Sequence, residues 1–332
     1  MTFALPDRWL WDSWYVRDGD LWHGFFLEAP KAIGDPDLRH WNVSIHHATS
    51  PDLRAWTSLG TCFRPAKGPA WDDGTTWTGS VVRGDDGRWH LFYTGTCRAE
   101  RCLKQRIGHA VSDDLHRWER ASDGPVLDIA PPYEEHDPAR WHDRAFRDPW
   151  VMRDPEGTGW LMFFTARRAD VPDTRSAGTI GLATSDDLHH WRLEPPVFTG
   201  SFGELEVPQV FRIADRWACL FCTGAPHWSK DATDALGIAR TGTHYLLGDS
   251  PRGPWTVAPG PLLDAAPFPR RYAGRIVETG AGLRFLGFRW FDAEGGPFVG
   301  AISDPDPVEV TGDGLLRLAV DRPAPPGPPA AL

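Results

Sequence analysis

The sequence predicts an all-β fold, a five-bladed β-propeller of four-stranded antiparallel blades. Three observations lead to this prediction. An aromatic-rich strand recurs five times, a turn rich in Gly, Asp or Pro precedes each copy, and a Ser-x-Asp-Leu-x-x-Trp unit follows the clearest copies. Radial repetition of such units leaves only short, protected sheet edges. A β-sandwich of short strands is the alternative, but it does not explain the repeat.

The strands of each repeat follow in a fixed order. The aromatic strands cover residues 21–27, 89–95, 160–165, 217–223 and 283–289. The turns before them, such as Asp85-Asp86-Gly87, join antiparallel strands. A third strand then leads into the unit that ends at Trp56, Trp118 or Trp191, with a divergent copy ending at Trp255 and a fifth without its Trp. Polar residues of this unit can form local side-chain-to-backbone bonds, and its Trp can pack on its own sheet.

The innermost strand of each repeat precedes the aromatic strand. These first strands begin near residues 11, 78, 147, 206 and 273. In a propeller they surround the central channel, so their ends meet at one mouth of it. Residues 1–322 are expected to form this single catalytic domain. The Pro-rich tail, residues 323–332, cannot form a sheet ladder and is predicted to be disordered.

Composition excludes several classes of partner. The net charge of −10 argues against nucleic acid and anionic membrane surfaces, which require a basic face. No apolar run approaches the roughly 20 residues of a membrane span. The first residues lack the features of a secretory signal, so a cytoplasmic location is expected. A neutral substrate suits this composition better, and the 18 Trp can pack blades or stack on sugar rings.

Three acidic residues stand at the starts of first strands. Asp12 lies in repeat one, Asp148 in repeat three and Glu206 in repeat four, and we expect them at matching positions of the repeated pattern. The closed ring would bring these distant residues to one mouth of the channel. Carboxyl groups arranged in this way are what the cleavage of a glycosidic bond requires.

The segments around these acids resemble a known pair of families. Trp11-Asp12-Ser13-Trp14, Trp77-Thr78-Gly79-Ser80, Phe146-Arg147-Asp148-Pro149 and Glu204-Leu205-Glu206-Val207-Pro208 are similar to the motif series of glycoside hydrolase families 68 and 32, the levansucrases, invertases and fructanases. The Trp-Asp-Ser-Trp form is closer to family 68. As in that family, the C-terminal β-sandwich typical of family 32 is not expected. Val207 departs from the pattern, because levansucrases usually carry Arg there and family 32 usually carries Cys.

The resemblance implies a retaining enzyme that acts on β-fructofuranosides through a covalent fructosyl intermediate. Asp12 would be the nucleophile, Asp148 the transition-state stabiliser and Glu206 the general acid/base. Glu206 must hold a proton near neutral pH, and the nearby Glu204 could raise its pKa by charge repulsion. The residues expected to contact substrate are Trp11, Trp77, Ser80, Arg147, Glu204, Gln209 and Tyr245. No cofactor and no catalytic metal are expected, while a structural Ca²⁺ on Asp-rich loops stays open.

Two alternatives remain at this point. An inverting propeller enzyme resembling family 43 arabinanases and xylosidases would also use two Asp and one Glu on repeats one, three and four. A propeller that binds sugar without chemistry is the second alternative, because a fold does not by itself determine function.

Overall fold

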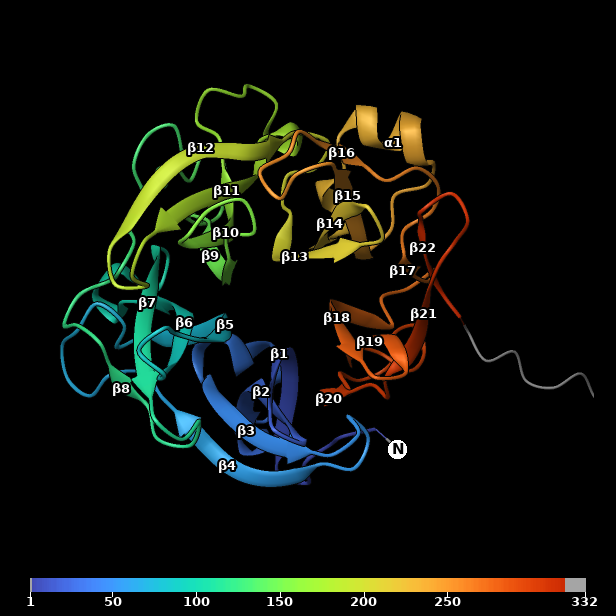
Figure 1. Cartoon of the computed structure of the whole chain (residues 1–332). Helices are drawn as coiled ribbons and strands as arrows, with labels where there is room; N and C mark the ends of the chain where they lie inside the picture. The colour runs from blue at the N-terminus through green and yellow to red at the C-terminus, as the bar shows by residue number, and fades with distance from the viewer. Residues whose placement is uncertain (1, 320–332) are drawn as a thin grey trace, which may run out of the picture.

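The computed structural model describes residues 2–319 and shows a closed ring of five antiparallel sheets (Figure 1). Each sheet runs outward in chain order from an innermost strand, so the predicted five-bladed propeller is confirmed. In the described part of the chain every strand belongs to one of these blades, and no β-sandwich accompanies them. Residues 320–322 of the expected domain and the whole predicted tail, 323–332, lie outside the described residues.

The first three blades have four strands each. Blade one consists of β1 (Arg8–Asp18), β2 (Leu21–Pro30), β3 (Ser44–Ser50) and β4 (Thr57–Phe63). Blade two consists of β5 (Thr75–Arg83), β6 (Trp89–Thr96), β7 (Gln105–Ser112) and β8 (Glu119–Arg120). Blade three consists of β9 (Phe146–Arg153), β10 (Trp160–Arg167), β11 (Gly178–Ser185) and β12 (Trp191–Thr199).

Blades four and five each gain one short extra strand. Blade four consists of β13 (Glu206–Ile213), β14 (Arg216–Thr223), β15 (Gly242–Gly248), β16 (Trp255–Val257) and β17 (Asp264–Ala265), and both β16 and β17 pair with β15. Blade five consists of β18 (Arg271–Thr279), β19 (Gly282–Arg289), β20 (Ala301–Ile302), β21 (Asp306–Val310) and β22 (Leu316–Leu318). Both β20 and β21 pair with β19.

The helices are short and lie in the connections. The α-helix α1 (Lys230–Leu236) lies at the outer side of blade four, where the Ser229 hydroxyl caps it by accepting a bond from the Ala232 N–H at 3.1 Å (Figure 1). The 3₁₀ turns are η1 (Lys31–Ile33), η2 (Pro36–Trp41), η3 (Arg98–Glu100), η4 (Thr174–Ser176) and η5 (Ala225–His227). None of the helices in residues 2–319 is long or apolar enough to cross a lipid bilayer.

The repeated Ser-x-Asp-Leu-x-x-Trp unit forms the same turn in the first three blades. In blade one the Asp52 carboxylate accepts bonds from the backbone N–H groups of Arg54 and Ala55, at 2.9 and 2.8 Å. The indole of Trp56 then donates to the carbonyl of Leu53 at 3.0 Å. Equivalent bonds follow Asp114 and Asp187. The turn is therefore encoded locally, by a carboxylate that replaces missing backbone acceptors.

Aromatic side chains of the second strands fill the space between blades. Each blade contributes a Phe with no exposed surface, namely Phe25, Phe92, Phe163, Phe221 and Phe285. Burial of one such ring contributes about 2–3 kcal/mol. The recurring aromatic strand of the sequence is thus the inter-blade packing layer.

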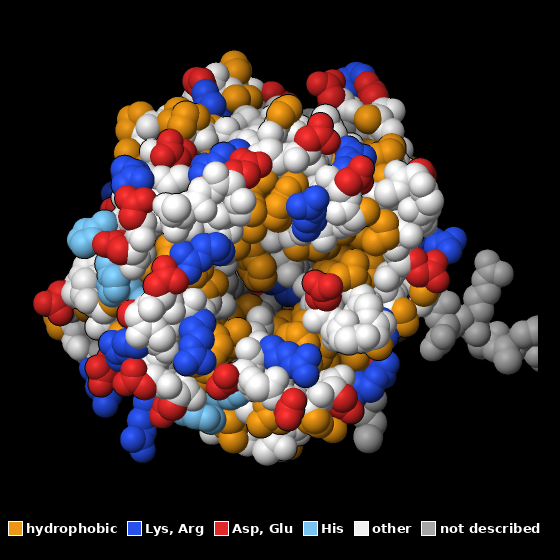
Figure 2. All heavy atoms as spheres, in the orientation of Figure 1, with side chains coloured by type: hydrophobic (Ala, Val, Ile, Leu, Met, Phe, Trp, Pro, Cys, Tyr) orange, Lys and Arg blue, Asp and Glu red, His pale blue; other side chains and the backbone are white. Residues whose placement is uncertain are grey.

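The ring closes between blade one and blade five. Phe3 and Ile302 exchange two backbone hydrogen bonds, of 3.0 and 2.9 Å. The N–H of Leu10 donates to the carbonyl of Gly300 at 2.9 Å. The N-terminal segment therefore extends blade five while it leads into β1. Figure 2 shows the resulting face, hollowed at the centre of the ring.

Histidine pairs occupy the first two blade interfaces. In blade one His23 Nδ1 and His47 Nε2 lie 2.9 Å apart, and the His47 ring stacks on Phe25 with centroids 4.7 Å apart. His116, from the turn of blade two, covers this pair with its ring centroid 5.0 Å from that of His47. Blade two repeats the arrangement with His90, His109 and Phe92, covered by His189 of blade three.

These interfaces should make the fold sensitive to acid. Burial lowers the pKa of both His47 and His109 to about 3, assisted by the neighbouring histidines. The unfolded chain, with ordinary pKa values near 6.5, then binds more protons below neutral pH, so stability falls as pH falls. We expect a loss of about 2 kcal/mol per cluster between pH 7 and pH 5. The measurement is urea unfolding at both pH values. The double variant His47→Gln/His109→Gln should lose much less stability over this interval, and an equal loss would contradict the assignment.

Candidate active site

A pocket of about 430 Å³ opens where the innermost strands begin. All five innermost strands contribute to it. Its floor and walls include Trp11, Asp12, Trp77, Thr78, Arg147, Asp148, Glu206, Val207 and Tyr272. Residues from η2 and from the loops before β9 and β13 form the rim. The ring closure therefore brings Asp12, Asp148 and Glu206 into one cavity.

A β-bulge at the same point of every innermost strand shapes this cavity. The pairing register with the second strand shifts after Trp11, Trp77, Arg147, Glu206 and Tyr272. In a regular strand consecutive side chains face opposite sides, but a bulge places an extra residue on one strand and re-aims the side chains beside it. Two consecutive residues of β1, β5, β9 and β13 can therefore both line the pocket.

The register corrects one expectation from the sequence. Asp12 and Asp148 occupy the bulge position itself, together with Thr78, Val207 and Ala273. Glu206 stands one residue earlier, level with Trp11, Trp77, Arg147 and Tyr272. The three acids were expected at matching positions, and for Glu206 this is wrong. Val207 has φ +54° and Asp148 has φ +58°, so Val207 is the counterpart of Asp148 in the bulge. The sequence pattern misled because residue types do not mark which residue stands at the bulge.

Asp12 is held by one hydroxyl and lies in the electrostatic field of two guanidinium groups. The Thr78 hydroxyl donates a short hydrogen bond to Asp12 Oδ2. Burial raises the pKa of Asp12 above its ordinary value, and this outweighs the lowering by Thr78, Arg275 and Arg39. A desolvated carboxylate held by a single hydroxyl is a reactive nucleophile, because little hydration must be removed before it attacks.

Asp148 is fixed from two blades. Its Oδ2 accepts bonds from the Thr165 hydroxyl at 3.2 Å and from the Val207 N–H at 3.0 Å. Its own N–H donates to Thr94 Oγ1 at 2.8 Å. Burial and the charge of Asp12 raise the pKa of Asp148 to about 6, although Arg147 lowers it. These bonds leave the second carboxylate oxygen available to accept hydroxyl groups of a bound sugar.

Glu206 is the most accessible carboxyl of an ion-pair cluster. Its side chain is 24% exposed, against 4% for Glu204. Arg147 Nη2 donates to Glu206 Oε1 at 3.0 Å, and the Tyr272 hydroxyl donates to Oε2 at 2.5 Å. Burial and the charge of Glu204 raise the pKa of Glu206 to about 7, against the lowering by Arg147 and Tyr272. Among the three pocket acids, Glu206 is therefore the one suited to carry a proton near neutral pH.

Glu204 lies behind Glu206 and stays ionised. Although burial alone would raise its pKa, Arg147, His227 and His142 bring the pKa of Glu204 below its ordinary value. Arg147 Nη2 donates to Glu204 Oε1 at 2.9 Å, and His227 Nδ1 lies 3.1 Å from Oε2. Glu204 therefore carries a permanent negative charge, which is the source of the expected repulsion with Glu206.

Aromatic and polar side chains that sequence reasoning missed complete the pocket. They are Arg39, His40, Trp41, Thr78, Gln105, Tyr272 and Trp290. The Trp41 and Trp77 rings lie 5.8 Å apart, and the Trp77 indole donates to the carbonyl of His40 at 2.9 Å. The strand register could have identified Thr78 and Tyr272, which are level with Asp12 and Glu206. The residues of η2 belong to no repeat, so the sequence held no signal for them.

Trp11, Trp77, Arg147 and Glu204 line the pocket, but three residues expected to contact substrate lie elsewhere. Ser80 and Gln209 lie deeper in the channel, past the bulge, and join neighbouring blades. The Ser80 hydroxyl accepts from the Val151 N–H at 3.0 Å, and the Gln209 amide binds the backbone N–H and C=O of Ile276 at 2.8 and 2.6 Å. Tyr245 packs in the outer part of blade four, where its hydroxyl accepts from the Leu316 N–H at 2.9 Å. These three side chains stabilise the contacts between neighbouring blades.

One group of residues in the described chain could offer metal ligands. Ligand atoms of His142, Asp143 and Glu204 lie within 4.8 Å of one another. The Arg147 guanidinium already contacts Asp143 at 3.5 Å and Glu204 at 2.9 Å, so a cation there would meet a fixed positive charge. The expectation that the chemistry needs no metal or cofactor stays a prediction.

Known proteins share this fold. An inulosucrase from Halalkalicoccus jeotgali bound to kestose has a TM-score of 0.76 at 24% identity, with 95% of this chain and 87% of that chain covered. A levansucrase from Gluconacetobacter diazotrophicus has a TM-score of 0.72 at 17% identity, with 95% and 81% covered. At this level of identity the likeness concerns the fold.

Sequence relatives are enzymes named for fructans. A levanase of Bacillus sp. (strain L7) is 29% identical over 230 residues, which are 62% of this chain and 22% of the relative. A levanbiose-producing levanase of Bacillus subtilis (strain 168) is 26% identical over 268 residues, 76% of this chain and 46% of the relative. The chain spans less than half the length of these relatives.

A family model settles the membership. The N-terminal domain of glycosyl hydrolases family 32 matches residues 10–251, which include Asp12, Asp148 and Glu206. The Trp-Asp-Ser-Trp form pointed towards family 68, whereas the matching model is that of family 32. With most of its propeller covered by that model, this chain belongs to glycosyl hydrolase family 32.

Proposed function

We propose that the protein cleaves β-fructofuranosides, such as sucrose, fructo-oligosaccharides or fructan, with retention of configuration. The observation that carries this proposal is the combination of three carboxyl groups in one sugar-sized pocket, with the pKa of Glu206 raised to about 7. Family membership and the levanase relatives support the fructoside as substrate class. The acceptor of the fructosyl group is water or a sugar hydroxyl.

The residues divide the reaction into two displacements. Asp12 attacks the anomeric carbon of the fructosyl ring while Glu206 gives its proton to the departing glycosidic oxygen. The C–O bond to the leaving group breaks as the ester to Asp12 forms. Glu206 then takes a proton from the incoming hydroxyl, whose oxygen displaces the Asp12 carboxylate. Asp148 accepts ring hydroxyls whose hydrogen bonds strengthen as positive charge develops.

Arg147 and Tyr272 orient the proton donor. Both contact Glu206, so its carboxyl group is held in one position at the edge of the pocket. The Trp11 and Trp77 rings offer apolar faces to the sugar. An inverting enzyme would use the same three acids with a water between two of them, and the anomer released first, followed by NMR, distinguishes the two outcomes.

The nucleophile is tested by Asp12→Asn. This change removes the attacking charge with little change of volume, so turnover of fructosides should fall by roughly 10⁴-fold or more while the fold persists. Release of reducing sugar gives the rate, and circular dichroism checks the fold. Asp20→Asn is the control, because Asp20 is exposed in the turn between β1 and β2 and does not line the pocket. Full activity in Asp12→Asn would reject Asp12 as the nucleophile.

The proton donor is tested by Glu206→Gln. The variant cannot protonate the leaving oxygen, so cleavage of sucrose should fall by about 10²–10⁴-fold. An aryl fructofuranoside with an acidic phenol leaves without help, and its cleavage should fall far less. Initial rates on both substrates measure the difference. Equal losses on the two would assign Glu206 a different role.

The pKa shifts predict a narrow bell-shaped dependence of kcat/KM on pH. Asp148 must be ionised, so activity is lost as pH falls through about 6. Glu206 must be protonated, so activity is lost as pH rises through about 7. Glu204→Gln removes a like charge and should move the alkaline limb to lower pH. Tyr272→Phe removes a hydrogen bond that favours the ionised form of Glu206, and it should move the alkaline limb to higher pH. Shifts of the opposite signs would reject this account of Glu206.

A further inference from the structure

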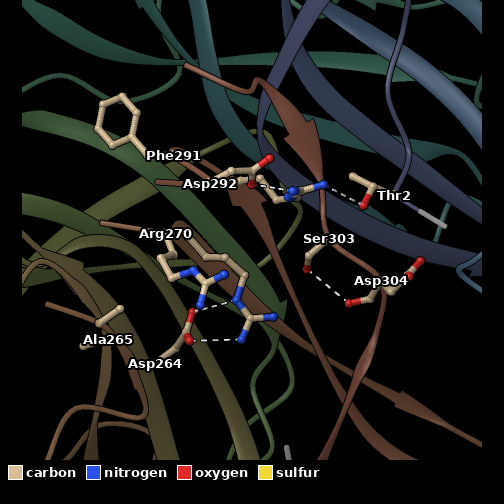
Figure 3. Close-up of a pocket in the computed structure, with 11 residues that line it drawn as sticks. Thr2, Asp264, Ala265, Arg270, Phe291, Asp292, Ser303 and Asp304 are labelled. Carbon is tan, nitrogen blue, oxygen red and sulfur yellow. Dashed lines mark hydrogen bonds and ion pairs between the residues drawn. The ribbon is translucent and has the colours of Figure 1, made fainter. Parts of the chain in front are cut away.

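A second cavity, of about 350 Å³, lies in blade five outside the active pocket. Its lining comes from the start of β18, the end of β19, β17 with the loop that follows it, and the segment around Thr2 (Figure 3). The volume is within the range of small-molecule sites, about 300–1,000 Å³. None of its residues takes part in the chemistry proposed above.

A thin wall separates this cavity from the active pocket. Arg271 lines the second cavity and Tyr272 the active pocket. In the same way, Phe291 lines the second cavity and Trp290 the active pocket. The Trp290 N–H donates to the carbonyl of Arg270 at 2.8 Å, so the wall is a continuation of the β18–β19 ladder. The two cavities therefore open at the same end of the ring, one residue apart.

The polar lining of the second cavity is balanced in charge. Three arginines and three aspartates face it, namely Arg270, Arg271, Arg289, Asp264, Asp292 and Asp304. Arg271 is fixed by Asp264, with bonds of 3.1 and 3.0 Å, and by Asp306 at 2.5 Å. An anionic ligand would meet carboxylates here, and a cationic ligand would meet guanidinium groups. A neutral ligand with many hydroxyl groups can donate hydrogen bonds to the carboxylates and accept them from the guanidinium groups.

Two side chains are available for such a ligand. The Arg270 side chain is exposed and forms no hydrogen bond or ion pair with any residue of the described chain, and its guanidinium lies 5.9 Å from the centroid of the Phe268 ring. Phe291 is partly exposed, and one face of its ring stacks on Trp290 with centroids 5.9 Å apart, so a ligand would use the other face. In the view of Figure 3 its ring and the Arg270 side chain lie on one side of the cavity, with Thr2 and Ser303 on the other. An aromatic face beside hydrogen-bonding groups is what a sugar ring requires.

We propose that this cavity is an accessory carbohydrate site, which holds a neutral polysaccharide chain while one end of it occupies the active pocket. The proposal rests on the proposed function, because it assigns a fructan as the polymer. Phe291 stacks on a sugar ring, and Arg270 donates to its hydroxyl groups. A short substrate that fills only the active pocket gains nothing from this site.

The double variant Arg270→Ala/Phe291→Ala tests the site by the length of the substrate. With levan or inulin as substrate, KM should rise roughly three- to tenfold. With sucrose or an aryl fructofuranoside, kcat and KM should stay within error of the parent. The matched control Arg192→Ala/Leu59→Ala removes an exposed Arg and an exposed apolar side chain from blades three and one, and should change neither. Unchanged KM for the polymers would overturn the proposal.

Binding without turnover separates this proposal from the proposed function. The full chain carrying Asp12→Asn is run in gels containing levan, inulin or other neutral polysaccharides. One of them should retard it, and adding Arg270→Ala/Phe291→Ala should weaken the retardation at an unchanged melting temperature. Retardation by a polysaccharide that is not a fructan would keep the site and reject a fructan as its ligand. If no polysaccharide retards the chain, or the double variant is retarded equally, there is no accessory site.

Discussion

A single buried guanidinium makes the candidate site possible. Arg147 contacts Asp143, Asp148, Glu204 and Glu206, all within 3.7 Å. Carboxylates gathered in a desolvated pocket would otherwise repel one another or take up protons. Although burial opposes the charged form, these carboxylates raise the pKa of Arg147 well above its ordinary value, so the positive charge is permanent. Burial and the excess of negative over positive charge raise the pKa of Glu206, which is the group that must exchange a proton.

The scaffold beneath the pocket is a layer of bonds that joins one blade to the next. Ser80 binds the backbone of blade three, and the Trp150 indole donates to the carbonyl of Val210 in blade four at 3.1 Å. Gln209 binds Ile276 of blade five, and the buried Arg275 donates to the carbonyl of Ser13 in blade one at 3.1 Å. This layer follows directly below the bulges. Catalytic geometry in the ring therefore depends on polar side chains that never meet the substrate.

The sequence predicted the repeat, the blade number and the gathering of Asp12, Asp148 and Glu206, because each depends on local patterns repeated five times. It misplaced Ser80 and Gln209, because residue type alone does not distinguish a strand position inside the pocket from one two residues further along the strand. It missed Tyr272 because the residue types of β18 do not reveal the bulge that sets the register of this strand. It missed Trp41 because the β2–β3 connection that contains η2 differs in length and sequence from the equivalent connections of the other blades. Features that recur in every blade can be recognised in a single sequence, whereas features that occur once can be found only in the structure.

The bridge between Phe3 and Ile302 also constrains the order of assembly. Blade one cannot be locked in place until strands almost three hundred positions later have formed, because the residues that meet there are 3 and 302. Contacts of such long sequence separation slow folding, since loop closure must precede any gain from the contact. Asp12 and Tyr272 lie on the two sides of that seam. A nascent chain would therefore carry every reactive group yet remain inert until the last blade docks, which delays the appearance of activity until synthesis of the ring is nearly finished.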